Sequence, residues 1–142
     1  MDAAKISRTG LDVEWQRLQV IAQNLASVDA SRTASGAPVR AMRLISGPID
    51  DFGTVLSAKG GPIDPKGVRV FGVEAAPESV RRVYDPSDPQ ADAQGFVSHP
   101  AIDHAGEMTL LIRTSRAYEA DLTVMSIADK MDSRALDLGR NS

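Results

Sequence analysis

The sequence predicts an α+β protein with two long terminal helices packed as a coiled-coil-like pair, a small β-rich middle region containing Pro and Gly, and an extended arm. All eight prolines lie between residues 38 and 100, and nine of the eleven glycines lie between residues 36 and 106. Proline breaks helix interiors and glycine weakens them. Long helices are therefore expected only at the two ends, where apolar residues recur at helical spacing.

The N-terminal helix is expected over residues 7–28, with Ser7 as its N-cap, because a serine hydroxyl accepts a hydrogen bond from the first turn. Its main apolar row consists of Leu11, Leu18, Ile21, Leu25 and Val28. Ile6, Val13 and Val20 form a second row. The two rows cover more surface than one partner helix would bury, which predicts two neighbours. Asn24 lies within the main row, where it either fixes the register of a buried contact or lies at the wet edge of the row.

The C-terminal helix is expected over residues 106–138. One heptad-like seam consists of Leu110, Ala117, Ala120, Val124, Ile127, Met131 and Leu138. A second seam beside it consists of Leu111, Tyr118, Leu122 and Met125. The ordinary interpretation of two amphipathic helices is an antiparallel pair within one chain. The double seams favour additional partners.

The middle of the chain is expected to hold short strands at residues 39–45 and 68–73, in a hairpin or a three-stranded sheet. An extended, Pro-rich arm is expected to follow over residues 84–100. The predicted division of the chain is 1–33 for the N-terminal helix, 34–83 for the β-rich region, 84–105 for the arm and 106–142 for the C-terminal helix.

Composition excludes several classes of protein. The net charge is −3, whereas nucleic-acid-binding proteins usually carry a basic excess. Cysteine is absent, so neither disulfides nor thiolate metal sites are possible. No apolar run approaches the ~20 residues of a membrane span, and the first residues lack the layout of a cleaved secretory signal. Composition alone therefore predicts a cytoplasmic protein.

Catalytic chemistry finds little support in the sequence. His99, Asp103, His104 and Glu107 resemble metal ligands, but two histidines beside a loop are more often simply solvated. No glycine-framed serine of a hydrolase is present, and Gly60-Gly61 lacks the Lys-Ser/Thr of a phosphate-binding loop. We therefore expect no enzyme activity, no cofactor, no metal, no small-molecule substrate and no nucleic-acid partner.

Each end of the chain carries a distinctive motif. The first motif runs from Gly10-Leu11 through Arg17-Leu18 to Ile21-Ala22-Gln23-Asn24-Leu25-Ala26. The second is Glu107-Met108 followed by Ser115-Arg116-Ala117-Tyr118-Glu119-Ala120. The two motifs resemble those of the flagellar rod and hook axial proteins. The arm, with Tyr84-Asp85-Pro86-Ser87 and Ala91-Asp92-Ala93-Gln94-Gly95-Phe96-Val97, is similar to that of the proximal-rod members of this family.

The resemblance implies a proximal-rod subunit of the tubular drive shaft that transmits motor torque. Its implied partners are copies of itself, other rod proteins, and the export-gate and membrane-ring proteins at the rod base. It also changes the expected location to the periplasmic rod of the flagellar basal body, after export without a cleaved signal peptide. The alternative is a soluble helical adaptor without a flagellar role.

The same resemblance gives a set of expected contact residues. Those for subunit packing are Leu11, Leu18, Ile21, Asn24, Leu25, Val28, Tyr118, Leu122, Val124, Met125, Ile127, Met131 and Leu138. Those for the arm are Tyr84, Pro86, Gly95 and Phe96.

Overall fold

The computed structural model describes residues 3–30, 37, 39–57, 65–76 and 80–140. Its elements, in chain order, are α1 (Ala3–Ala26), β1 (Met42–Pro48), α2 (Phe52–Ser57), β2 (Val68–Ala75), β3 (Val80–Tyr84), β4 (Phe96–Pro100) and α3 (His104–Arg140). Two terminal helices and a small antiparallel β region are present, so the predicted α+β class is confirmed. Among the described residues, neither long helix carries an apolar stretch of the length that a bilayer requires.

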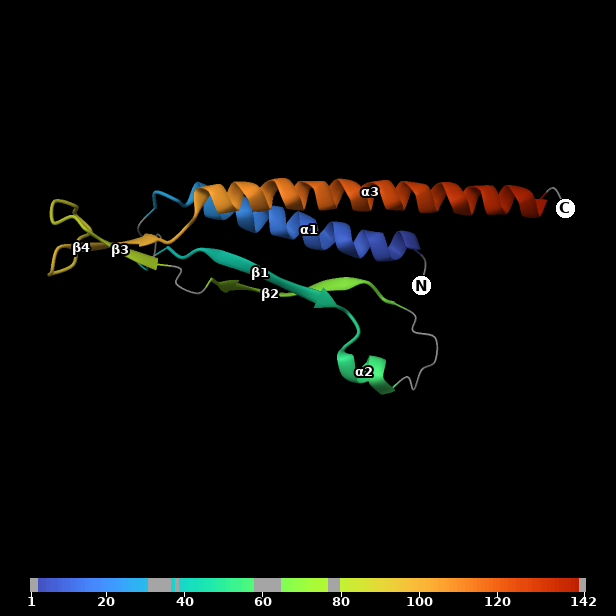
Figure 1. The fold of residues 1–142 in the computed structure, drawn as a ribbon, viewed down its shortest axis with the longest axis horizontal. Coiled ribbons are helices and arrows are strands. Elements are labelled where there is room, and N and C mark those ends of the chain that lie inside the picture. Colours follow the sequence, from blue (N-terminus) through green and yellow to red (C-terminus); the bar gives the residue numbers. More distant parts are fainter. Residues whose placement is uncertain (1–2, 31–36, 38, 58–64, 77–79, 141–142) are drawn as a thin grey trace.

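The two terminal helices lie side by side and run in opposite directions (Figure 1). α1 lies between α3 and the β1–β2 hairpin, and it contacts both. This position explains the two apolar rows of α1, since each of two neighbours buries part of its surface. Val13 from the second row and Ile21 from the main row are 4% and 3% exposed. The two neighbours that bury the surface of α1, namely α3 and the β1–β2 hairpin, therefore belong to the same chain.

α3 is 37 residues long, against 24 residues for α1. It extends past the N-terminal end of α1 (Figure 1). Every residue from 129 to 140 is exposed. At 1.5 Å per residue this overhang measures about 18 Å. α3 is thus paired with α1 along part of its length and continues beyond α1 as a single helix (Figure 1).

Three polar contacts join one face of α1 to the β1–β2 hairpin. The backbone N–H of Val68 donates to Thr9 Oγ1 over 3.0 Å. Arg17 Nη2 donates to Ser46 Oγ over 2.8 Å. The side chain of Asn24 binds both backbone groups of Met42. Successive residues of this series are seven or eight positions apart, which is two turns of helix, so all three side chains project from one face.

The helix and strand boundaries differ from the predicted ones. α1 begins at Ala3, so Ser7 is not its cap and instead lies inside the helix, 8% exposed. α1 ends at Ala26 because a turn follows, in which Ser27 N donates to Asn24 O. β1 starts at Met42 where residue 39 was expected, and Asn24 holds the backbone of this first strand residue beside α1.

The predicted extended arm is wrong in one respect, because the chain folds back on itself there. β3 pairs with β4 in an antiparallel hairpin, with Val80 opposite Pro100 and Tyr84 opposite Phe96. β1 pairs separately with β2, so the described residues form two two-stranded sheets where a hairpin or a three-stranded sheet was expected. The prolines at 86 and 89 lie in the connection between β3 and β4, where proline is favoured, and do not extend the chain. The domain division stays a prediction.

Candidate subunit interface

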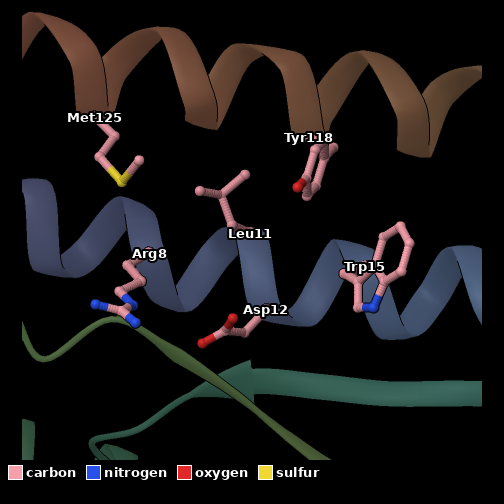
Figure 2. Close-up of a pocket in the computed structure, with 6 residues that line it drawn as sticks. All are labelled: Arg8, Leu11, Asp12, Trp15, Tyr118 and Met125. Carbon is pink, nitrogen blue, oxygen red and sulfur yellow. The ribbon is translucent and has the colours of Figure 1, made fainter.

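One face of the helix pair carries a groove of about 470 Å³. Its lining consists of Arg8, Leu11, Asp12 and Trp15 from α1 and Tyr118 and Met125 from α3. Figure 2 shows Leu11 pointing from α1 toward α3, between Met125 and Tyr118. The rings of Trp15 and Tyr118 lie 6.3 Å apart at a tilt of 45°. Trp15 is nevertheless 54% exposed, so a large aromatic surface remains open at this groove.

The face of α3 that contacts α1 carries its buried residues. Glu107, Thr114 and Ala128 are buried there. Leu111, Tyr118 and Met125 lie on the same face and are half-buried. These residues follow each other in steps of three, four or seven, which is the spacing of one helix face.

Part of the first predicted seam of α3 remains exposed, and we call this part the outer seam. Its large members are Val124, Ile127, Met131 and Leu138. They are 47%, 51%, 66% and 71% exposed, in that order. The outer seam lies roughly a third of a turn around the helix from the face that contacts α1. Large exposed apolar side chains that gather on one face of a helix favour an interaction site.

The predicted packing residues divide into three groups by burial. Leu11, Ile21 and Asn24 are buried within the chain. Leu18, Leu25, Val28, Tyr118 and Met125 are half-buried. Leu122 and the four large residues of the outer seam are exposed. The exposed group is available to a neighbouring subunit, whereas the buried group holds the monomer together. Their role in subunit packing itself stays a prediction.

A polar junction joins three elements at the end of the helix pair. Asn24 is 2% exposed and Glu107 is 1% exposed. Arg43 Nη1 of β1 donates to Glu107 Oε1 over 2.5 Å, and Asn24 Nδ2 of α1 donates to Glu107 Oε2 over 3.3 Å. The sequence indicated Asn24 as a possible register residue, and the structure places it in a buried contact. Arg43 was missed, because a single sequence gives no sign of a partner 64 positions away.

The tip of the β3–β4 hairpin is built from a few specific contacts. Tyr84 and Phe96 meet edge to face, with ring centroids 5.3 Å apart. The Arg82 guanidinium lies 4.8 Å from the Phe96 ring centroid and also pairs with Asp92. A hydrogen bond from the backbone N–H of Phe96 lowers the pKa of Asp92 from its ordinary value of 3.8. Of the predicted arm residues, Tyr84 and Pro86 are exposed, Phe96 is half-buried and Gly95 is buried.

The residues considered as metal ligands do not form a ligand set. The carboxylate of Glu107 already binds Arg43 and Asn24. His99 lies in β4 opposite Arg81, and His104 begins α3. Within the described ranges, no group of three or more His, Asp and Glu side chains is arranged to hold a metal ion.

Comparison with known proteins identifies the family of this chain. A model of the C-terminal region of flagellar basal body rod FlgEFG proteins matches residues 93–138, which cover β4 and most of α3. The flagellar basal-body rod protein FlgC of Bacillus subtilis (strain 168) is 31% identical over 142 residues, with 95% of each chain covered.

Two further relatives bear the same name. FlgC of Escherichia coli O6:H1 is 33% identical, with 95% of this chain and 94% of the relative covered. FlgC of Borreliella burgdorferi is 34% identical, with 92% and 91% covered. These identities extend over nearly the whole of both chains, helices and β region included. This chain therefore belongs to the FlgC family of flagellar basal-body rod proteins.

Proposed function

We propose that the chain performs its structural role in the flagellar rod as a proximal-rod subunit, whose outer seam and groove contact neighbouring subunits in a tubular drive shaft that transmits torque. The observation that carries this proposal is the outer seam, a row of large apolar side chains left exposed on the longest element of the molecule. The family is one of structural rod proteins and not of enzymes. The relatives named above are all rod proteins, which favours the rod over a soluble adaptor.

Burial of the outer seam by a neighbour supplies the energy for assembly. Full burial of a Val, Leu, Ile or Met side chain contributes about 1.5–3 kcal/mol. The half-exposed side chains of the outer seam can gain part of that amount each, against the cost of immobilising a subunit. A contact between two different faces, such as the outer seam on one copy and the groove on the next, does not close on itself and propagates into a helical tube.

The proposed partners are copies of this chain, other rod proteins, and the export-gate and membrane-ring proteins at the rod base. The proposed location is the periplasmic rod, reached by export without a cleaved signal peptide. Coiled-coil geometry between α1 and α3 belongs to the same proposal. The acidic balance, a net charge of −3, supports a protein partner over nucleic acid.

The test is the substitution Val124→Asp, with Ser126→Asp as its control. Both positions are exposed on α3, but Ser126 lies away from the outer seam. A carboxylate at position 124 would have to be desolvated in the contact, which is strongly unfavourable. We expect the first variant to be made and exported at normal levels but to form no rods or hooks, and the control to swim. Normal motility of the Val124→Asp strain would refute the role of the outer seam.

A further inference from the structure

The polar junction depends on a carboxylate that is almost completely shielded from water. Among the residues that the structure describes, Glu107 is the largest side chain with less than 2% exposure, and it lies in the first turn of α3. Its two oxygens have different partners, Arg43 Nη1 at 2.5 Å and Asn24 Nδ2 at 3.3 Å. A buried carboxylate is strongly destabilising when its partners are missing, and it is tolerated when they are in place.

Both partners of Glu107 are held by strand β1. Arg43 is a β1 residue, and the same Nη1 atom also donates to the Met42 carbonyl over 3.2 Å. Asn24 belongs to α1, but its amide is oriented by Met42: Oδ1 accepts from the Met42 N–H and Nδ2 donates to the Met42 carbonyl, each over 2.9 Å. Without β1, Glu107 would lose its cationic partner, and Asn24 would lose the contacts that orient it.

We propose that Asn24, Arg43 and Glu107 form a latch that makes docking of α3 on α1 conditional on the β1–β2 hairpin. α1 and α3 are complementary along much of their length, but the first turn of α3 cannot settle while its carboxylate is unpaired. The hairpin supplies the missing charge when β1 reaches its place beside α1. The outer seam is on the same helix, so docking of the first turn of α3 also helps to position the outer seam relative to the rest of the subunit. This inference concerns the isolated chain and does not depend on the proposed rod contacts.

Native-state hydrogen exchange of the full chain tests the latch through Arg43→Met, a change confined to β1. We expect amides of α3 near Glu107 and of α1 near Asn24 to exchange at least tenfold faster than in the unmodified protein. Lys66→Met is the control. It removes the ion pair between Lys66 Nζ and Asp50 Oδ1, which are 2.7 Å apart, and it leaves the three latch residues unchanged. Unchanged α3 protection in Arg43→Met would overturn the proposal.

The double variant Arg43→Met/Glu107→Met distinguishes the effect of an unpaired Glu107 carboxylate from the effect of lost side-chain packing. It removes the carboxylate together with its partner, so α3 is expected to recover protection to within about threefold of the original. If Arg43→Met alone is unfolded and the double variant is folded, the unpaired carboxylate is the cause and the latch is supported. If the double variant is unfolded as well, packing of these side chains explains the effect and the latch is rejected.

A substitution in β1 away from the latch residues tests whether the state of the hairpin affects the docking of α3. A Cβ atom at Gly47 would lie 2.8 Å from the Phe71 ring, so Gly47→Val forces this ring of the hairpin to move without touching any latch residue. In the original background we expect this change to accelerate exchange in the first turns of α3. In the Arg43→Met/Glu107→Met background we expect α3 to be insensitive to it. Equal sensitivity in both backgrounds would show that the hairpin acts on α3 by another route.

Discussion

Gly10 on α1 faces Asp121 on α3 so closely that a Cβ atom at position 10 would lie 2.6 Å from Asp121 Oδ2. The absence of a side chain at Gly10 lets the carboxylate of Asp121 lie against the backbone of α1. This contact is at the level of the groove, since Leu11 is the next residue of α1. The distance between the two helices is therefore set here by one glycine and one acidic side chain.

A branched side chain at this crossing should push the helices apart. Gly10→Val is expected to destabilise the monomer by about 1–3 kcal/mol, the usual cost of overpacking. The measurement is the midpoint of urea unfolding followed by circular dichroism. Gly139→Val is the matched control, because a Cβ atom at Gly139 would meet nothing within 4 Å. An equal loss in both variants would mean that the contact with Asp121 does not cause the effect, since valine has a higher helix propensity than glycine.

Removal of the negative charge of Asp121, at the same helix contact, should stabilise the monomer. Burial raises the pKa of Asp121 above its ordinary value of 3.8. Asp121→Asn keeps the shape and removes the desolvated charge, so we expect a small gain at pH 7, up to about 0.5 kcal/mol after solvent screening.

The pH dependence of this gain has a definite sign. The folded state binds the proton of Asp121 at higher pH than the unfolded chain does, because its pKa is raised. Stability of the unmodified protein therefore rises, relative to Asp121→Asn, as the pH falls through the raised pKa toward 3.8. The difference between the two unfolding free energies should disappear below that range. A difference that persists unchanged at low pH would contradict the assignment.

The tip of the β3–β4 hairpin should be sensitive to a side chain at Gly95. This residue has a φ of +80°, and a Cβ atom there would lie 2.9 Å from the Tyr84 ring. Gly95→Ala is expected to cost about 1–2 kcal/mol, the penalty for a left-handed backbone conformation in other residues. Faster cleavage between residues 85 and 95 in limited proteolysis would report this loosening. Gly72→Ala in β2, where a Cβ atom would meet nothing within 4 Å, should not alter cleavage at the tip.

Deletion of the part of α3 that extends beyond α1 should abolish assembly while leaving the stability of the monomer nearly unchanged. Removal of residues 129–142 takes away only exposed side chains among those described, so the unfolding free energy is expected to change by less than about 0.5 kcal/mol. Assembly into rods should be lost, because Met131 and Leu138 of the outer seam are removed. The measurements are urea unfolding of the purified monomer and electron microscopy of basal bodies from the deletion strain. Intact rods would show that the overhang is not part of a subunit contact.

The helices could be predicted because proline, glycine and apolar spacing are local signals. The positions of Pro38 and Pro100, together with the apolar periodicity outside them, were enough to place both helices and to separate them from the β region. The ends were less predictable. Ser7 has the chemistry of a cap, yet the helix continues through it to Ala3, because helical apolar spacing also includes Ile6 and no proline interrupts the first turns.

The hairpin at the arm and the polar junction could not be predicted, because both depend on contacts between distant residues. β3 and β4 find each other across a connection rich in turn-forming residues, and prolines at 86 and 89 were interpreted as extension. Glu107 was considered as a metal ligand, since its carboxylate gives no sign in the sequence of whether it is buried. Asn24 was the exception: a polar residue within an apolar row was itself a visible signal.

The unequal length of the two terminal helices has a mechanical consequence for the proposed rod. Subunits that ended flush with one another would leave planes across which the shaft could shear. A single helix that projects about 18 Å beyond α1 would instead overlap the next subunit, so that no plane separates one subunit from the next. Twisting load would then pass from one subunit to the next through the side-chain contacts of the overlapping helix, while the backbone hydrogen bonds of α3 keep that helix straight.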